Sequence, residues 1–271
     1  MDFGNEALTD KQSIADAFAH YFQSVFERGS ESQMPVFHGS GFDFPDVTDD
    51  DILSSIKSLK PKKATGSDNI PSYIFKGCAN FLLAPLKYLF NLSFKQGCFP
   101  DKLKESIVTP IFKKGKRNNI MDYRPISLLN NLGKIFEKII YKSIFSQVSD
   151  KISVYQHGFL PDRSTITNLC IFCEHVSNAI LNKQQLDVIY TDCAKAFDKV
   201  DHGILIRKLK DLGFSGRSLK LLDSYLSGRS QRVKVGNILS FLYFATSGVP
   251  QGSNLGPLLF LLFSSMICLK V

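Results

Sequence analysis

The feature that most constrains this sequence is an apolar run close to its C-terminal end. The residues from Leu255 to Leu269 include no charged side chain, so a folded chain must remove them from water, either in a bilayer or in a protein core. A membrane-spanning helix needs roughly 20 apolar residues, and this run is shorter and has Gly256 and Pro257 near its start. We therefore predict a buried core helix and no membrane partner.

The composition is that of a folded protein with a mild excess of positive charge. Hydrophobic residues make up 44% and charged residues 21% of the 271 residues, which argues against intrinsic disorder and allows one large domain or two small ones. Lys and Arg outnumber Asp and Glu by 33 to 25, a formal net charge of +8. This excess favours a polyanionic partner such as nucleic acid, although many basic proteins have no such partner.

The cysteines predict an intracellular protein, nuclear or cytoplasmic, with reduced thiols. They have no disulfide-framework spacing, and the N-terminus shows no secretory leader. Cys170 and Cys173 form a C-x-x-C pair, but a zinc site needs four ligands and no second pair follows at a useful distance. Because both lie in a helical pattern of apolar residues from Leu169 to Ile180, we expect buried core thiols.

Residues 1–60 are predicted to form an N-terminal helical segment and linker ahead of a main domain over residues 61–271. Thr9 and Gln12 form a capping box before an apolar helical pattern that Gly29 should end. The following stretch is rich in Gly, Ser and Pro, which predicts a linker.

A second helix is expected from Thr48 to Pro61. Asp49, Asp50 and Asp51 would lie in its first turn, where acidic side chains suit the positive end of the helix dipole. The triplet also suggests a metal cluster, but capping explains it without a ligand, and we adopt the capping interpretation.

From Pro61 onward, helical and strand patterns alternate, which predicts a mixed α+β fold with helices packed on a small sheet. The expected helices span Leu82–Phe94, Leu132–Val148, Ile166–Ile180, Ile204–Leu212 and Leu219–Leu226, and the expected strands span Ser106–Phe112 and Leu186–Thr191. Gln231–Val235 and Phe241–Thr246, joined through Gly236-Asn237, predict a hairpin.

One polar string, from Asp192 to His202, follows the predicted strand Leu186–Thr191. A carboxylate at a strand end can project into a cleft and hold Mg²⁺, which prefers oxygen ligands and is commonly held by one or two carboxylates plus substrate phosphates. Asp198 and Asp201 alone do not make a two-metal site, which needs carboxylates from more than one element. The alternative is that all three aspartates are solvated turn residues.

Two further strings are open to more than one interpretation when taken alone. Gly248 to Pro257 contains a Pro-x-Gly-Ser turn at the start of the apolar helix, which could expose backbone amides to an anion or simply begin the helix. Asp122 to Leu129 follows a lysine-rich turn and holds Arg124 before a proline. That arginine could grip a triphosphate by paired hydrogen bonds, or the string could be a charged loop on a solvated face.

Taken in order, these strings resemble the reverse transcriptase domain of non-LTR (LINE-like) retrotransposons over nearly the whole chain. The matching blocks are Phe18–Phe26, Lys63–Pro71, Gly97–Pro100, Pro110–Gly115, Tyr123–Leu128, Gln156–Phe159 with Arg163–Thr165, Asp192–His202 and Gly248–Pro257. The last two resemble the family patterns D-x-x-K-A-F-D-x-V-D-H and G-V-P-Q-G-S-x-L-G-P. So many ordered matches exclude an unrelated basic protein, and group II intron and telomerase polymerases fit less well.

The resemblance implies a right-hand polymerase with fingers and a partial palm, in which helices pack on a small antiparallel sheet. It also implies an RNA-directed DNA polymerase, which is a nucleotidyltransferase. A primer 3′-hydroxyl attacks the α-phosphate of a dNTP, two magnesium (or manganese) ions stabilise both oxygens, and pyrophosphate leaves. The partners would be an RNA template, a DNA primer and dNTP, with no organic cofactor.

The resemblance also assigns roles to individual residues. Asp192 would be the catalytic, metal-binding aspartate, with the carbonyl of Cys193 as a second metal ligand. The nucleotide would be bound by Lys113, Arg124, Phe197, Gln251 and Gly252, and the Phe197 ring would exclude a ribose 2′-hydroxyl. Nucleic acid would be bound by Lys63, Lys114, His157 and Arg163. We expect Asp198, Asp201 and His202 to be structural, with a carboxylate or an imidazole among them capping the helix that follows.

The resemblance has a gap in the last residues of the chain. The family carries an aromatic-Ala-Asp-Asp hairpin beyond the G-V-P-Q-G-S block and then a thumb, whereas Phe263 to Val271 contains no carboxylate. From the sequence we therefore expect the thumb to be absent and the purified chain to lack magnesium-dependent primer extension. The alternative is a non-catalytic RNA- or DNA-binding remnant of a retroelement, which tight RNA binding without turnover would favour.

Overall fold

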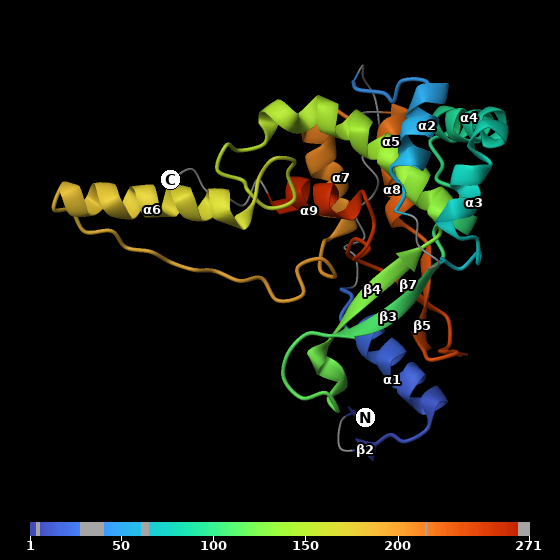
Figure 1. The fold of residues 1–271 in the computed structure, drawn as a ribbon, viewed down its shortest axis with the longest axis horizontal. Coiled ribbons are helices and arrows are strands. Elements are labelled where there is room, and N and C mark those ends of the chain that lie inside the picture. The colour runs from blue at the N-terminus through green and yellow to red at the C-terminus, as the bar shows by residue number, and fades with distance from the viewer. Residues whose placement is uncertain (4–5, 28–40, 61–64, 215, 265–271) are drawn as a thin grey trace.

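The computed structural model describes residues 1–3, 6–27, 41–60, 65–214 and 216–264, and Figure 1 shows their arrangement. A body of packed helices lies beside a small sheet, helix α1 (Lys11–Ser24) lies against the sheet, and helix α6 (Thr165–Leu181) projects away from both. The predicted mixture of helices packed with a small sheet is confirmed.

The helical body contains the larger of the hydrophobic clusters. Its helices are α2 (Asp49–Lys57), α3 (Ser72–Gly77), α4 (Ala79–Gln96), α5 (Asn131–Val148), α7 (His202–Asp211), α8 (Gly216–Leu226) and α9 (Gly256–Ser264). Short 3-10 helices lie at η1 (Asp101–Leu103), η2 (Ile120–Asp122) and η3 (Ser149–Lys151). The ring of Phe136 stacks on Phe90 with 4.3 Å and on Phe99 with 5.3 Å between centroids, and burial of these rings stabilises the body.

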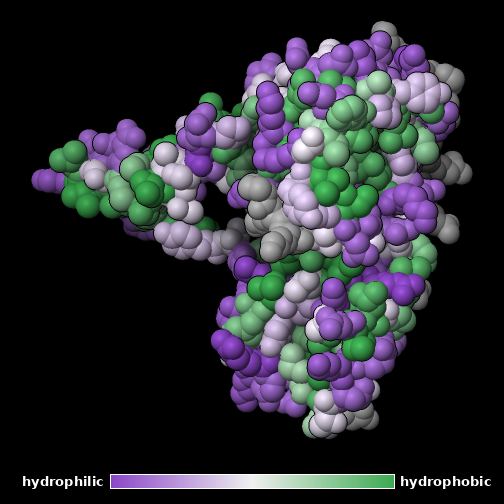
Figure 2. Space-filling view, turned by 45° about the vertical axis from the view of Figure 1, so that its right-hand side comes forward, coloured by the Kyte–Doolittle hydropathy of each residue, from purple (hydrophilic) through white to green (hydrophobic). Residues whose placement is uncertain are grey.

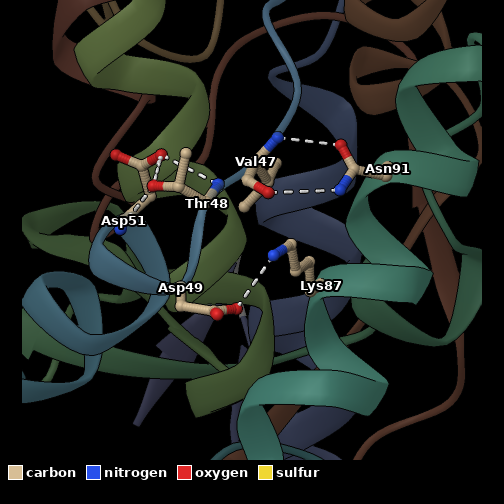
Figure 3. A network of polar contacts seen from close by, with 6 residues as sticks. All are labelled: Val47, Thr48, Asp49, Asp51, Lys87 and Asn91. Carbon is tan, nitrogen blue, oxygen red and sulfur yellow. Dashed lines mark hydrogen bonds and ion pairs between the residues drawn. The ribbon is translucent and has the colours of Figure 1, made fainter.

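The start of α2 follows the chemistry expected from its sequence. The side chain of Thr48 accepts a hydrogen bond from the amide of Asp51, and the Asp51 carboxylate accepts one from the amide of Thr48 (Figure 3). This confirms the capping interpretation of the acidic triplet. The side chain of Asn91 in α4 pairs with both backbone groups of Val47, so the chain ahead of α2 is anchored on α4. The helix ends at Lys57, earlier than predicted.

The sheet contains β3 (Ser106–Phe112), β4 (Tyr123–Leu129), β5 (Arg229–Val235), β6 (Ile238–Leu239) and β7 (Tyr243–Ala245). The strand order is β4-β3-β5-β6, and β7 also pairs with β5. Most pairings are antiparallel, but β3 and β5 are parallel, with Val108 opposite Val233. The predicted antiparallel sheet is therefore wrong at this pairing, because a long helical crossover lets β3 and β5 run in the same direction.

The predicted hairpin is confirmed in part. β5 and β6 are joined through Gly236-Asn237, where Gly236 has a φ of 63°, as a tight hairpin turn requires. The strand expected over Phe241–Thr246 is shorter and pairs with the start of β5 as β7. Apart from this sheet, β1 (Asp2–Phe3) and β2 (Glu6–Ala7) pair with each other.

Helix α1 packs on the sheet through a second hydrophobic cluster. The members of this cluster include Phe18, Phe22, Val108, Val233 and Tyr243. The helix is capped by Asp10 rather than by the predicted Thr9, because the Asp10 carboxylate accepts a hydrogen bond from the amide of Ser13 at 2.8 Å. Its last residue is Ser24, and Gly29, the predicted end, lies outside the described residues.

Helix α6 and the segment after it correct two predictions. The helix forms where its pattern predicted it, but none of its side chains is buried, and Cys170 and Cys173 are exposed. Figure 2 shows this arm standing clear of the body with hydrophobic side chains on its surface. Leu186–Thr191 forms no strand with any described residue, and Tyr190 is 82% exposed. A strand needs a hydrogen-bonded neighbour and a core thiol needs a packing partner, and the described part of the chain supplies neither.

Helix α9 confirms the buried core helix predicted for the apolar run, as far as the described residues reach. Its buried residues include Leu258, Leu259, Leu261 and Leu262. Within the described ranges, no helix is both long and apolar enough to cross a membrane. Residues 265–271 lie outside the described part.

Candidate functional site

A cleft of about 690 Å³ lies between α1, the sheet and two loops. The wall combines several parts of the chain: Tyr21 and Phe22 of α1 with Val25 and Phe26 just after it, Lys113, Arg124 and Ser127 around β3 and β4, residues 192–198, Arg229 and Gln231 of β5, and residues 247–253. Segments that are far apart in the sequence therefore meet at one site.

All the residues predicted to bind metal or nucleotide line this cleft. They are Lys113, Arg124, Asp192, Cys193, Phe197, Gln251 and Gly252. Lys114, His157 and Arg163, which were predicted to contact nucleic acid, are not part of its wall. Lys63 lies outside the described residues. The structure thus brings together three polar strings that were ambiguous one at a time.

Two cations line the cleft at this edge of the sheet, Lys113 in the connection between β3 and β4 and Arg124 on β4. Asp122 shapes the connection, since its carboxylate accepts a hydrogen bond from the amide of Lys116 at 2.8 Å and its carbonyl accepts one from the amide of Lys113 at 2.9 Å. Arg124 follows on β4, opposite Ile111 of β3. The side chains of Lys113 and Arg124 are exposed, which suits contact with a polyanion.

The loop 192–200 is pinned to the turn ahead of α9 by backbone hydrogen bonds. The amide of Val249 donates to the carbonyl of Phe197 at 2.8 Å, and the amide of Gly248 donates to the carbonyl of Val200 at 2.8 Å. Gly248 has a φ of 85°, and a Cβ there would lie 2.7 Å from the Phe197 carbonyl oxygen, so this close approach requires glycine. The Phe197 ring stacks on Phe260 of α9 at 4.9 Å, which fixes it in the cleft wall.

Two further contacts hold this loop in place. Nζ of Lys195 lies over the ring of Tyr21 at 4.6 Å from its centroid, which joins the loop to α1. Nε2 of His202 lies 2.8 Å from the carbonyl oxygen of Gly248. His202 therefore ties α7 to the turn ahead of α9, a structural role, and the helix cap is made by another residue of the motif. The contribution of α1 to the cleft was not predicted from the sequence.

The prediction that a carboxylate of this motif caps the next helix is confirmed for Asp201, whereas Asp198 has another role. Asp201 makes the cap of α7, by accepting a hydrogen bond from the amide of Ile204 at 2.8 Å. The Asp198 carboxylate instead accepts two hydrogen bonds from Nε2 of Gln251, at 3.0 and 3.1 Å. Burial raises the pKa of Asp198 from 3.8 to about 6, against the opposing effects of the Gln251 hydrogen bond and the charge of Lys195.

The turn ahead of α9 lies against β4 and α5. The amide of Ser127 donates to the carbonyl of Gln251 at 2.7 Å. Gly252 has a φ of 122°, and a Cβ there would lie 2.6 Å from the carbonyl oxygen of Ser127, so a side chain would break this contact. The amide of Asn254 donates to Oε2 of Glu137 at 2.8 Å. A carboxylate of α5 therefore holds the far end of the turn.

A buried polar network behind this turn was not predicted. Glu137 is 1% exposed and its Oε1 accepts a hydrogen bond from the hydroxyl of Tyr225 at 2.9 Å. Arg229 is 2% exposed, and its guanidinium lies over the Tyr225 ring. Burial raises the pKa of Glu137, and the charge of Arg229 opposes this rise. A sequence signal existed, because Glu137 falls on the same helix face as the apolar Ile140 and Ile144.

The predicted nucleic-acid residues outside the cleft lie in two loops. Lys114 is exposed in the β3–β4 connection. Nδ1 of His157 lies 2.8 Å from the hydroxyl of Thr167, and Nη1 of Arg163 donates to the carbonyl of Val154 at 2.6 Å. His157 and Arg163 therefore shape the loop before α6, and their contact with nucleic acid stays a prediction.

For a metal ion, the cleft offers oxygen donors. Asp192 is exposed in its wall, and Cys193 beside it supplies a backbone carbonyl. Among the residues that the structure describes, no group of three or more His, Cys, Asp or Glu side chains could hold an ion. The donors present suit Mg²⁺, which is commonly held by one or two carboxylates together with substrate phosphates.

Comparison with known proteins identifies the family. The sequence profile described as reverse transcriptase (RNA-dependent DNA polymerase) matches residues 111–268. The "Probable RNA-directed DNA polymerase from transposon BS" of Drosophila melanogaster is 33% identical over 97% of this chain and 30% of its own length. The RNA-directed DNA polymerase from mobile element jockey of Drosophila funebris is 32% identical over 81% of this chain and 24% of its own length.

A type-1 retrotransposable element offers a more distant relative. The retrovirus-related Pol polyprotein from element R1 of Bradysia coprophila is 27% identical over 84% of this chain and 22% of its own length. The chain thus spans less than a third of the length of these relatives. It belongs to the reverse transcriptase family, and it carries a reverse transcriptase domain of the non-LTR retrotransposon kind.

Proposed function

We propose that the cleft binds an incoming deoxynucleoside triphosphate as part of an RNA-directed DNA polymerase. The observation that carries this proposal is the convergence of Lys113, Arg124, Asp192, Phe197 and Gln251, from distant parts of the sequence, on one cleft. In this assignment the β3–β4 hairpin belongs to the fingers, and the loop 192–200 with the turn ahead of α9 belongs to a partial palm.

The side chains of the cleft suit the separate parts of such a nucleotide. Lys113 and Arg124 are exposed cations on one wall, where they would bind the triphosphate by charge-assisted hydrogen bonds. The ring of Phe197, held by Phe260, would lie against the sugar and exclude a 2′-hydroxyl. Gln251 and Gly252 would contact the nucleotide where it pairs with the template.

The reaction needs no nucleophile from the protein. The primer 3′-hydroxyl would attack the α-phosphate of the bound nucleotide, and pyrophosphate would leave. Reverse transcriptases in general use divalent metal ions, and here the Asp192 carboxylate and the Cys193 carbonyl would hold magnesium or manganese. When bound, such an ion supplies electrostatic stabilisation to the phosphoryl oxygens. The cations of the chain orient the triphosphate, and Phe197 orients the sugar.

The template and primer would contact residues outside the cleft wall. Lys63, Lys114, His157 and Arg163 are proposed contacts to the RNA template and the DNA primer. The formal charge of +8 suits such backbone contacts, whose affinity falls steeply as the salt concentration rises. Base pairing, rather than side-chain contacts, would choose the nucleotide.

The test is binding of a fluorescent deoxynucleoside triphosphate to the purified chain with magnesium. Arg124→Ala should weaken binding roughly tenfold or more, because it removes a charge-assisted contact. The matched control is Arg232→Ala, which removes the same charge from an exposed residue of β5 outside the cleft wall. Equal loss in both variants, or no binding by the unmodified chain, would contradict the proposal. Tight RNA binding without nucleotide binding would favour a non-catalytic nucleic-acid-binding role.

A further inference from the structure

The contact between Asp198 and Gln251 determines which end of the Gln251 amide faces the cleft. Nε2 of Gln251 donates to both carboxylate oxygens of Asp198, at 3.0 and 3.1 Å. An ionised carboxylate can only accept hydrogen bonds, whereas an amide has one donating and one accepting end. The NH₂ group must therefore face Asp198, and the amide oxygen Oε1 is left on the other side of the group.

We propose that Asp198 is a positioning residue that fixes the polarity of the Gln251 amide, so that the cleft presents a hydrogen-bond acceptor to its ligand. This inference rests on the proposed nucleotide site. It predicts that the ligand must offer a hydrogen-bond donor at this point. A glutamine whose amide was free to rotate would accept either a donor or an acceptor there.

The surroundings leave the two side chains little freedom to separate. The carbonyl of Gln251 accepts a hydrogen bond from the amide of Ser127 at 2.7 Å, and the carbonyl of Asp198 accepts one from the hydroxyl of Ser247 at 2.7 Å. Both backbones are therefore fixed on opposite sides of the contact. Asp198 and Gln251 also both line the cleft, so the orientation of the Gln251 amide decides whether a bound ligand meets a hydrogen-bond donor or an acceptor.

The donor that fits this position is a sugar hydroxyl. Asp198 directly follows Phe197 in the chain, and the amide of Val249, two residues before Gln251, donates to the Phe197 carbonyl. The turn that carries Gln251 is thus tied to the loop that carries Phe197, and both residues line the cleft in which the sugar would rest. A deoxynucleotide sugar has one hydroxyl, at the 3′ position, and Oε1 of Gln251 would accept its hydrogen bond.

Protonation of Asp198 should release this constraint, because a protonated carboxyl also donates. Two charged or titratable groups face it. Lys195 of its own loop favours the ionised form of Asp198. Tyr243 of β7 has a raised pKa, mainly because it is buried and to a smaller extent because of the charge of Asp198. Burial raises the pKa of Asp198 to about 6, and the hydrogen bond from Gln251 and the charge of Lys195 oppose this rise.

The first measurement follows the side-chain NH₂ signals of Gln251 by NMR in the free chain as pH is varied. The signals are assigned by their loss in Gln251→Met. They should shift with a midpoint of about 6, and the shift should vanish in Asp198→Asn but remain in Asp201→Asn, which removes the same charge from the cap of α7. Gln251 signals that do not respond to pH would overturn the proposal, whether or not nucleotide binds.

The second measurement compares the magnesium-dependent affinity for a deoxynucleoside triphosphate with that for its 2′,3′-dideoxy counterpart. The unmodified chain should bind the nucleotide with a 3′-hydroxyl roughly three- to tenfold more tightly than the dideoxy nucleotide, which is the gain in affinity expected from one hydrogen bond. Asp198→Asn should lose this preference, because an asparagine accommodates either amide polarity, and Asp201→Asn should keep it. Equal affinities in the unmodified chain would overturn the inference and leave the proposed function intact. Binding of neither nucleotide would contradict the proposed function, and the amide titration would still decide the role of Asp198.

Discussion

Helices α5 and α6 have nearly the same length and both carry apolar residues at helical spacing, yet they differ completely in burial. α5 has 18 residues and includes the fully buried Ile135, Phe136, Ile140 and Ile144. α6 has 17 residues and none of them is buried. The periodic pattern therefore predicts that a helix forms, but whether the helix is buried depends on a packing partner from elsewhere.

The contrast extends to the segments beside each helix. α5 packs against α2, and it shares the larger hydrophobic cluster with α8 and α9. After α6, Ile189 is 87% and Tyr190 is 82% exposed. Regions with few buried apolar contacts open locally at low free-energy cost. The α6 arm should therefore contribute little to the free energy of unfolding, and the following variants test that difference.

The largest expected difference in the free energy of unfolding comes from replacing one isoleucine by alanine, first in α5 and then in α6. Ile144→Ala in α5 should lower the free energy of unfolding by about 2–5 kcal/mol, because it leaves a cavity in a packed core. Ile180→Ala in α6, at a side chain that is 70% exposed, should change it by less than about 0.5 kcal/mol. Denaturant unfolding followed by circular dichroism measures both. Similar losses in the two variants would show that α6 is packed.

The next effect compares two aspartates of the loop that follows the α6 arm. Partial burial raises the pKa of Asp198 to about 6, so the folded state holds its proton more tightly than the unfolded chain does. The free energy of unfolding should therefore fall as pH rises from about 4 to about 6 and stay low above that window. Asp198→Asn cannot ionise and should be more stable than the unmodified chain by about 2–3 kcal/mol near pH 7.

The control for this prediction is Asp192→Asn, in an exposed residue of the same loop. It should leave the free energy of unfolding within about 0.5 kcal/mol at every pH. The free energies of unfolding of the two variants are measured by denaturant titration at a series of pH values. A destabilised Asp198→Asn near pH 7 would mean that the ionised carboxylate is favoured in the folded state.

A smaller change in the free energy of unfolding is expected when a tyrosine loses its hydroxyl, in the helical body or in the segment after α6. Tyr225→Phe removes the hydroxyl that donates to the buried Oε1 of Glu137, and should cost about 1–2 kcal/mol. Tyr190→Phe, in the exposed segment after α6, should have no measurable effect. Thermal unfolding of both variants provides the measurement, and an unchanged melting temperature for Tyr225→Phe would contradict the role given to the buried network.

The smallest effect concerns the thiols of α6. Cys173→Ser should change the free energy of unfolding by less than about 0.5 kcal/mol, because the side chain is exposed. Cys170 and Cys173 of the native chain should also react with a thiol reagent as quickly as they do in denaturant. Protection of both thiols in the native state would restore the prediction that they are core residues.

The sequence by itself determined the parts of this protein that depend on local chemistry. Capping side chains predicted the start of α2, glycine in a left-handed conformation ended α4 at Gly97, and Gly236-Asn237 made the hairpin turn. Each of the three polar strings was ambiguous from its local chemistry alone, and it was their order along the sequence, through the family resemblance, that pointed to residues of the cleft wall. Helix caps and turns depend only on residues that are close in the sequence, so they can be predicted without knowing the fold.

Only the tertiary structure decided which residues meet across the chain. The pairing of Asp198 with Gln251, the burial of Glu137 beside Tyr225 and the parallel pairing of β3 with β5 join residues that are distant in sequence. The failure of Leu186–Thr191 to form a strand has the same origin. Hydrogen bonding between strands, desolvation of a carboxylate and burial of a helix face all require a partner in space, and the periodicity of one segment does not specify that partner.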